Sequence, residues 1–208
     1  MTHAGERSAA DGTPPRIGAL VLAAGGSSRL GRPKQLVAYR GEPLVQRAAA
    51  AAVAAGAAPV VVVLGAHAAA VASALGGLPG VTTVTNEEWA QGMASSLVAG
   101  IRALTAMAVW DAVLITLSDQ PLVDARALGT LVAAFDDTRR IVAAEYGGAV
   151  GVPALIGREH LDDLLRLSGD AGAGRWLRAR LAAVTRVPMP GAALDVDTLE
   201  DVVALEDT

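Results

Sequence analysis

The sequence predicts a single α/β domain, built on a mainly parallel β-sheet with helices on both faces. Apolar runs typical of strands alternate with helix-like segments along nearly the whole chain. The runs at 17–24 and 59–65 are continuously apolar, as expected of strands that are buried on both faces. In such sheets, ligands bind beside the carboxyl ends of the strands. We therefore expect the functional residues in the loops that follow the strands.

The expected elements follow one another in a regular order. Pro43 suits the first turn of the first helix, and Gly56 suits its end. A stretch at 147–157 contains glycine and proline and interrupts the alternation of strands and helices, so it is expected to be irregular. Strands are expected at 17–24, 59–65, 81–86, 111–119, 140–146 and 185–189, and helices at 42–56, 67–75, 93–104, 124–135, 158–167, 173–184 and 199–206.

The N-terminal segment, residues 1–16, contains charged residues and two prolines but no apolar centre. It is expected to be a flexible leader rather than a signal peptide, with the folded domain at 17–208. No uninterrupted apolar run in the sequence reaches the roughly 20 residues that span a bilayer. We expect a cytoplasmic protein without a membrane partner.

The composition excludes several classes of function. The chain has 208 residues, of which 52% are hydrophobic and 18% charged, so a substantial core is expected rather than disorder. It has no cysteine, which excludes disulfides, thiolate catalysis and cysteine-based metal centres. A net charge of −4 and 3% aromatic residues argue against nucleic acid as a partner. A small charged ligand at one site fits this composition better.

The segment at 22–36, LAAGGSSRLGRPKQL, directly follows the first expected strand and contains glycines and basic residues. It is not a P-loop, because Arg32 follows Gly31 where that motif has lysine and then serine or threonine. It is not a dinucleotide-binding fingerprint either, because Gly26 and Gly31 have the wrong spacing and Pro33 interrupts the helix that should follow.

A third interpretation is a glycine-rich loop whose backbone N–H groups bind phosphates. Glycines without a Cβ allow the backbone to approach a ligand closely. Arg29 would donate to two phosphate oxygens at once, and Lys34 would act as a point charge. The alternative is an ordinary basic turn on the surface.

The loop resembles the signature loop of the molybdenum cofactor cytidylyltransferase family, which reads L-A-(A/G)-G, then R-(M/L)-G, then K after two residues. Residues 86–100 resemble the family segment N-x-x-W-x-x-G-M-x-x-S-L, 118–121 its D-(Q/M/L)-P metal motif, and 195–201 its closing D-(I/V)-D-T-P-E-D. These motifs occur in the family's order and extend over 17–206. The matching positions in the signature loop are Leu22, Ala23, Ala24, Gly25, Arg29, Leu30, Gly31 and Lys34.

The resemblance implies a Rossmann-like fold of the nucleotide-diphospho-sugar transferase type and a transfer of CMP from CTP to molybdopterin. Arg29 and Lys34 would then contact the triphosphate, and Ala24, which is glycine in guanylyl enzymes, favours cytosine by narrowing the space beside the base. Transient contact with a client molybdoenzyme is also implied. The nucleotide-binding residues expected are Leu22, Ala23, Ala24, Gly25, Gly26, Gly31, Asn86, Gln91, Gly92, Ser95 and Ser96. For Ser95, helix capping is an equal alternative.

Carboxylates are expected to bind Mg²⁺, with Mn²⁺ as a possible substitute, because triphosphate chemistry normally uses such a cation. Asp119 stands at the end of an expected strand, where a turn role before Pro121 is the alternative. Asp197 is the second expected ligand, although it also has the form of a capping box with Glu200. Asp195 is the third candidate. Arg29, Lys34 and Asp119 are the expected catalytic residues.

The acceptor segment resembles the family's G-x-P and G-D-x-G-A motifs, with two departures. Val152 precedes Pro153 where many members have histidine, and Gly174 intervenes before Arg175. The acceptor therefore stays more open than the nucleotide: a GTP-dependent enzyme, another acceptor such as a sugar phosphate, and a non-catalytic cofactor-carrying chaperone are the alternatives. The acceptor-binding residues expected are Gly151, Pro153, Gly169, Asp170 and Arg175.

Overall fold

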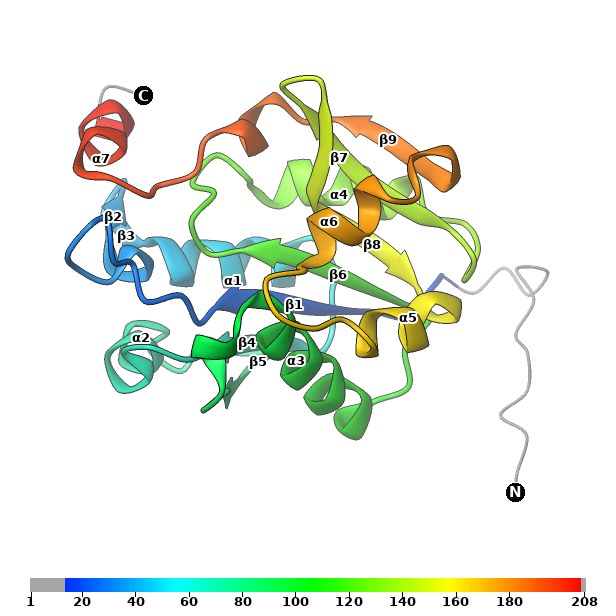
Figure 1. The fold of residues 1–208 in the computed structure, drawn as a ribbon, viewed down its shortest axis with the longest axis horizontal. Helices are drawn as coiled ribbons and strands as arrows, with labels where there is room; N and C mark the ends of the chain where they lie inside the picture. The colour runs from blue at the N-terminus through cyan, green and yellow to red at the C-terminus, as the bar shows by residue number, and fades with distance from the viewer. Residues whose placement is uncertain (1–13, 207–208) are drawn as a thin grey trace.

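The computed structural model describes residues 14–206, which form an α/β domain around a seven-stranded sheet (Figure 1). The strand order is β5-β4-β1-β6-β8-β7-β9, and only β8 runs antiparallel to its neighbours. The mainly parallel α/β fold predicted from the sequence is therefore confirmed. The strands are β1 (Ile17–Ala23), β4 (Val60–Leu64), β5 (Val81–Thr85), β6 (Ala112–Leu117), β7 (Ile141–Tyr146), β8 (Ala149–Gly157) and β9 (Val184–Pro188).

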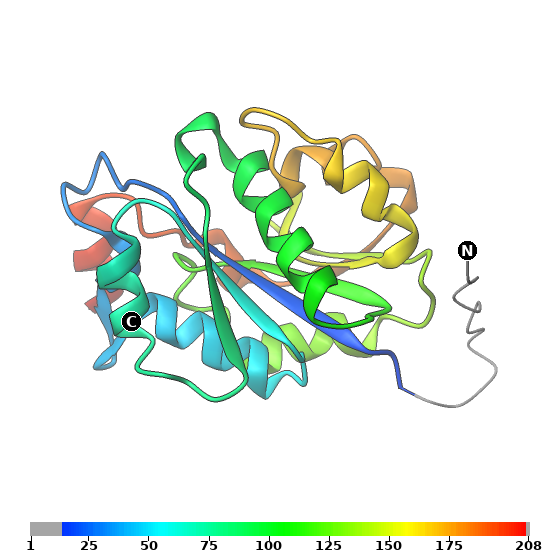
Figure 2. The ribbon, with the colours of Figure 1, turned by 90° about the horizontal axis from the view of Figure 1, so that it is seen from below.

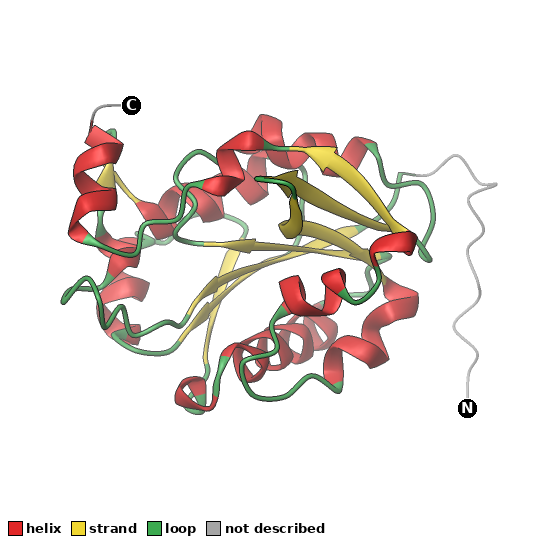
Figure 3. Ribbon diagram, turned by 45° about the horizontal axis from the view of Figure 1, so that its top comes forward, coloured by secondary structure: helices red, strands yellow, loops and turns green. Residues whose placement is uncertain are grey.

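Helices cover both faces of the sheet (Figure 2). One face packs against α1 (Leu44–Ala54), α2 (Ala68–Ala74) and α4 (Ala125–Ala133). The other packs against α3 (Met93–Met107), α5 (Leu161–Leu165) and α6 (Ala173–Arg178). Figure 3 shows the strands enclosed between these two helical layers. The last helix, α7 (Leu199–Glu206), instead packs with the loop that follows β1 and a small hairpin, β2 (Ala38–Tyr39) and β3 (Glu42–Pro43).

Successive side chains of β1 point to opposite faces of the sheet, and both faces are buried, which explains why the sequence of β1 is continuously apolar. Ala19 and Val21 enter the core on the α1 side, whereas Leu20 and Leu22 enter the core on the α3 side. Close packing fixes α3 against the sheet, since a Cβ at Gly100 would lie 2.7 Å from a Val63 methyl carbon. This packing holds the carboxyl ends of β1, β4 and β6 in fixed positions.

Three expectations from the sequence are corrected by the structure. Residues 147–157 are not irregular, because most of them form the central strand β8. Its pairing with β7 shifts register between Ala143 and Ala144, and Val152 and Pro153 lie at this bulge, where a residue without an N–H is tolerated. The hairpin β2–β3 was not expected, and Pro43 directly precedes α1 instead of lying in its first turn.

The two helices expected between 158 and 184 are also shorter than predicted. The first is a 3₁₀ turn, Arg158–His160, followed by the single short helix α5. The second ends at Arg178, and residues 181–183 form a separate 3₁₀ turn before β9. Tertiary packing, not the local pattern, sets these ends.

Most of the predicted leader, 1–16, lies outside the described residues. Its last residue, Arg16, is held on the domain, since its guanidinium lies 3.1 Å from a carboxylate oxygen of Asp111. None of the helices within residues 14–206 has the length and apolar character needed to cross a membrane.

Candidate functional site

Three segments that are distant in the sequence meet at the carboxyl ends of the central strands. The loop 24–34 leaves β1, and the turn 118–121 leaves the neighbouring strand β6. The segment 194–198 passes beside this turn, and the N–H of Val196 donates to the carbonyl oxygen of Asp119 at 2.9 Å. This is the edge of the sheet at which the topology predicts a ligand.

Lys34 joins the basic loop to the carboxylates. Its Nζ ion-pairs with Oδ2 of Asp119 and lies 2.8 Å from Oδ1 of Asp197. Arg29 reaches the other oxygen of Asp197 at 2.7 Å. The four residues expected to form a triphosphate-and-metal site from the sequence are thus brought into one ion-pair network.

The charges in this network stabilise one another. Burial opposes the charge on Lys34, but the attraction of Asp119 and Asp197 outweighs it and raises the pKa of Lys34. The hydrogen bond from Lys34 lowers the pKa of Asp197 below its usual range. Both groups therefore stay charged at neutral pH, as a site for anionic phosphates and a cation requires.

Gln35, which the sequence analysis did not single out, shapes the basic loop. The residue is fully buried, and its Nε2 donates to the carbonyl oxygens of Ala23 at 2.9 Å and Gly25 at 2.8 Å. The N–H of Lys34 donates to Oγ of Ser27 at 3.0 Å. These bonds fold the loop back on the end of β1 and direct Lys34 at the carboxylates.

The segment after β5 contains the polar residues expected near a base and a ribose. Asn86 is buried, and its Nδ2 donates to Oγ of Ser95 at 2.9 Å and Oγ of Ser96 at 3.0 Å. The hydroxyl of Ser95 donates within the same segment, to the carbonyl oxygens of Glu88 and Gly92. Asn86, Ser95 and Ser96 therefore hold the segment together, whereas Gln91 is exposed beside them.

Two of the expected acceptor residues contact this segment. The N–H of Ala94 donates to the carbonyl oxygen of Gly169 at 3.1 Å. A Cβ at Gly92 would lie 2.5 Å from that oxygen and 2.7 Å from Oδ1 of Asp170. The loop at 168–172 thus packs directly on the expected nucleotide segment, while Arg175 is exposed on α6.

The remaining acceptor residues, Gly151 and Pro153, lie in β8 near the Asp119 turn. Gln120 connects the Asp119 turn to β8, because its buried Nε2 donates to the carbonyl oxygen of Val152 at 3.3 Å. The same Nε2 also donates to the carbonyl oxygen of Ala192 at 3.0 Å. The hydroxyl of Tyr146 donates to the same oxygen of Val152 at 3.0 Å. Neither Gln120 nor Tyr146 was among the residues predicted; the position of Gln120 within the metal motif was the only signal.

The carboxylates suit a divalent cation. Oδ1 of Asp119 is buried without a hydrogen-bond partner. Burial, and then the negative charge of Asp119, raise the pKa of the nearby Asp195 to about 6. A cation beside these two groups would give Oδ1 of Asp119 a partner and would stabilise the negative charge of Asp195. Within residues 14–206, no three His, Asp or Glu side chains are arranged to hold a metal alone, so substrate oxygens and water would complete its shell.

The capping role considered for Asp197 falls instead on its neighbour. Helix α7 begins at Leu199, and Oδ2 of Asp201 accepts from the N–H groups of Asp197 at 2.9 Å and Thr198 at 2.7 Å. The hydroxyl of Thr198 in turn accepts from the N–H of Asp201 at 3.2 Å. The capping box is thus Thr198–Asp201 rather than Asp197–Glu200, and the Asp197 carboxylate points to Lys34 and Arg29.

The sheet thus carries the basic loop after β1 and Asp119 after β6, with Asp195 and Asp197 on the segment that precedes α7. Residues 19–184 match the MobA-like NTP transferase domain, and the chain belongs to this family. A nucleotidyl transferase from Methanothermobacter thermautotroptrophicus is similar, with a TM-score of 0.78, 25% identity, and coverage of 92% of this chain and 96% of that protein.

Two further proteins are similar over nearly their whole length. Rv0371c from Mycobacterium tuberculosis H37Rv has a TM-score of 0.76 and 30% identity, with 93% of this chain and 99% of that protein covered. A structure of Rv0371c has also been solved as a complex with manganese. Nicotine blue oxidoreductase from Paenarthrobacter nicotinovorans is 36% identical over 203 residues, which cover 92% of this chain and 97% of that protein.

Proposed function

We propose that this protein transfers CMP from CTP to the terminal phosphate of molybdopterin, giving molybdopterin cytosine dinucleotide and pyrophosphate. The observation that carries the proposal is the contact of Lys34 with both Asp119 and Asp197. It joins a loop suited to phosphates with carboxylates suited to a divalent cation. A triphosphate needs both, whereas a neutral ligand needs neither.

The chain's own residues would act by positioning and charge. The backbone of the loop at 24–31 and the side chains of Arg29 and Lys34 would bind the β- and γ-phosphates and neutralise the departing pyrophosphate. Asp119 and Asp197, with Asp195 beside them, would hold Mg²⁺ or Mn²⁺. The cation supplies positive charge at the α-phosphate.

The bond changes need no strong general base. An oxygen of the acceptor phosphate forms a bond to the α-phosphorus of CTP, and the bond from that phosphorus to the oxygen of pyrophosphate breaks. A phosphomonoester loses its second proton near pH 6, so the attacking oxygen is already ionised at neutral pH. The charged groups of the site, Lys34, Arg29 and the aspartates, suit this task better than proton transfer.

The choice of CTP and of molybdopterin rests on fewer residues than the reaction type. The family resemblance is what makes Ala24 favour a pyrimidine, and the proposed acceptor residues Gly169 and Asp170 contact the segment after β5. GTP as donor, a sugar phosphate as acceptor, or delivery of the cofactor to a client molybdoenzyme are the alternatives within this site. A carrier alone would not need the network around Lys34.

A second candidate is an oxidoreductase, because the 36% identical relative is named nicotine blue oxidoreductase. The chain has no cysteine, so a redox reaction here would need an electron carrier from outside the protein. The basic loop at 24–34, although it lacks the dinucleotide-binding fingerprint, would then hold the pyrophosphate of a nicotinamide dinucleotide. Oxidation of NADH or NADPH with a reducible dye as acceptor, followed by absorbance, tests this candidate.

The proposed reaction is tested by pyrophosphate release with Mg²⁺. CTP, GTP, ATP and UTP are each combined with molybdenum-loaded molybdopterin and with a sugar phosphate. Release is expected with CTP and molybdopterin, and Lys34→Ala and Asp119→Ala are each expected to lower it by at least about 100-fold. Arg32→Ala, an exposed basic residue of the same loop, serves as the matched control and is expected to retain most activity. Activity with GTP alone would overturn the assignment of CTP, and near-normal turnover in either variant would overturn the catalytic roles.

A further inference from the structure

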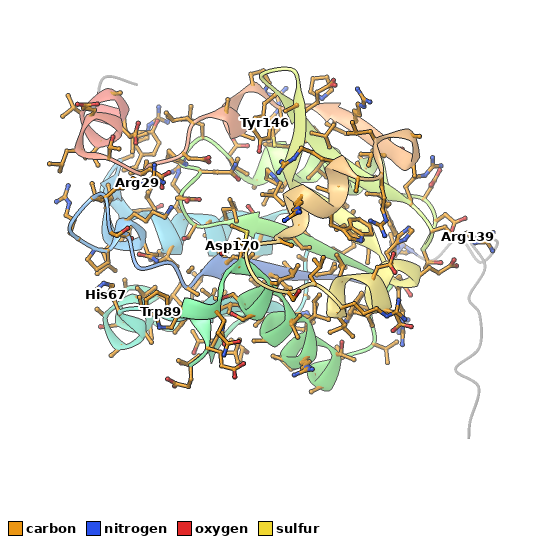
Figure 4. All side chains as sticks on the ribbon, viewed as in Figure 1. Arg29, His67, Trp89, Arg139, Tyr146 and Asp170 are labelled. Carbon is orange, nitrogen blue, oxygen red and sulfur yellow. The ribbon has the colours of Figure 1, made fainter. Side chains whose placement is uncertain are left out.

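Trp89 is an exposed tryptophan at the same edge of the sheet as the basic loop. It begins a 3₁₀ turn, Trp89–Gln91, soon after the carboxyl end of β5, and is 37% exposed. The other two tryptophans, Trp110 and Trp176, are buried, at 3% and 4%. Figure 4 shows Trp89 toward the same end of the molecule as Arg29. A large aromatic residue in this position needs an explanation.

Two glycines make room for this side chain. A Cβ at Gly26, in the basic loop, would lie 3.2 Å from Cζ3 of the indole. A Cβ at Gly65, after β4, would lie 2.7 Å from Cβ of Trp89 and 2.6 Å from the carbonyl oxygen of Ala24. The indole therefore packs against the backbone of the basic loop, where its six-membered ring reaches Gly26.

The backbone around Trp89 is held in place by hydrogen bonds. The N–H of Trp89 donates to the carbonyl oxygen of Asn86, and the N–H of Gly92 donates to the carbonyl oxygen of Trp89, both at 3.3 Å. The hydroxyl of Ser95 donates to the carbonyl oxygen of Glu88 at 3.0 Å. The backbone that carries the indole is therefore already ordered before a ligand binds.

We propose that the exposed part of the Trp89 indole is the surface on which the nucleobase stacks. The inference rests on the proposed function, since it requires a nucleotide whose phosphates lie along the loop at 24–34. Aromatic side chains can stack on any of the nucleobases, because every base has a π-face. Ala24 is buried and its Cβ lies beside Gly65, so it would influence the base only through this group of residues and not, as the sequence suggested, by narrowing the space beside the base. Trp89 contacts the base, and Ala24 is a positioning residue.

Tryptophan fluorescence and calorimetry together test this inference. CTP is titrated into the protein with Mg²⁺, and binding is followed by both methods. In the wild type, CTP is expected to quench the emission of Trp89, while the two buried tryptophans report that the fold is retained. Trp89→Phe is expected to abolish the quenching and weaken CTP binding only a few-fold. Trp89→Leu is expected to weaken binding by about 5- to 150-fold, the range that loss of one base–aromatic stack gives.

Trp110→Phe is the matched control, because it removes a tryptophan from the core and is expected to leave both quenching and affinity unchanged. CTP binding of wild-type strength in Trp89→Leu would overturn the stacking role and leave the proposed CTP site standing. Quenching by GTP but not CTP would support stacking and overturn the choice of CTP. If no nucleoside triphosphate binds the wild type, the inference and the proposed function are both wrong.

Discussion

Asp195 shows how a single carboxylate couples the site to stability. Burial and the charge of Asp119 raise its pKa to about 6, above the ordinary value of 3.8. A carboxyl group with a raised pKa binds its proton more tightly in the folded protein than in the unfolded chain. The ligand-free protein therefore loses stability as the pH rises from about 4 to about 6, and the full penalty is present above that range.

Asp195→Asn is expected to raise the melting temperature of the ligand-free protein at pH 7.5, because it removes this penalty. Solvent contact screens part of the interaction, so the expected gain in stability is about 1 kcal/mol. In a domain of this size, that gain raises the melting temperature by about 2 to 4 °C. The gain should vanish near pH 4, where the wild-type group is itself protonated. Asp162→Asn, at an exposed position of α5, is the control. An equal gain at pH 4 and pH 7.5 would contradict the assigned cause.

The sequence was informative about charged residues and much less so about the amides. Arg29, Lys34 and Asp119 could be assigned to one site because the family resemblance gives them related roles and each follows an expected strand; that these strands, β1 and β6, are neighbours is a finding of the structure. Gln35 and Gln120 could not, because their roles arise from carbonyl oxygens that become neighbours only on folding. For Gln120, one of these oxygens lies 72 residues away along the chain.

At the scale of elements, Gly92 is the junction between the segment after β5, where nucleotide-binding residues are proposed, and the proposed acceptor loop at 168–172. Its φ of +114° is a conformation that favours glycine, and a Cβ would meet the backbone of Gly169 at 2.5 Å. The carbonyl oxygen of Gly169 in turn accepts from the N–H of Ala94 at the start of α3. The two loops are thus positioned by one another.

Gly92→Ala is expected to destabilise the protein by about 1 to 3 kcal/mol, because both strain and a backbone clash oppose the new methyl group. Chemical denaturation measures the change. Gly129→Ala, in α4, is the matched control: nothing lies within 4 Å of its Cβ position, and the substitution is expected to stabilise by about 0.5 to 1 kcal/mol. A Gly92→Ala protein as stable as the wild type would contradict the described contact.

The elements that the sequence predicted well are those with a strong local pattern. The parallel strands and α1, α3 and α4 appear near their expected positions because their apolar periodicity agrees with their packing. Strand β8 was missed because Pro153 and its glycines argue against a central strand, and only the bulge opposite β7 accommodates them. Local pattern carries no information about such a bulge.

At the scale of the whole molecule, the fold creates a site that no contiguous part of the chain contains. Lys34 is separated by 85 residues from Asp119 and by 163 residues from Asp197, yet it contacts both. The sheet supplies the first contact, and the return of the C-terminal segment to the Asp119 turn supplies the second. Phosphate binding and cation binding should therefore be coupled, not independent.

Calorimetric titration of CTP with and without Mn²⁺ measures this coupling most directly. In the wild type, Mn²⁺ is expected to strengthen CTP binding by at least about tenfold, because it screens the repulsion between the triphosphate and the aspartates. In Asp119→Asn, which retains the shape of the side chain, most of that gain should be lost. CTP affinity that is the same with and without Mn²⁺ in the wild type, or a full Mn²⁺ effect in Asp119→Asn, would contradict a single nucleotide-and-metal site around Lys34.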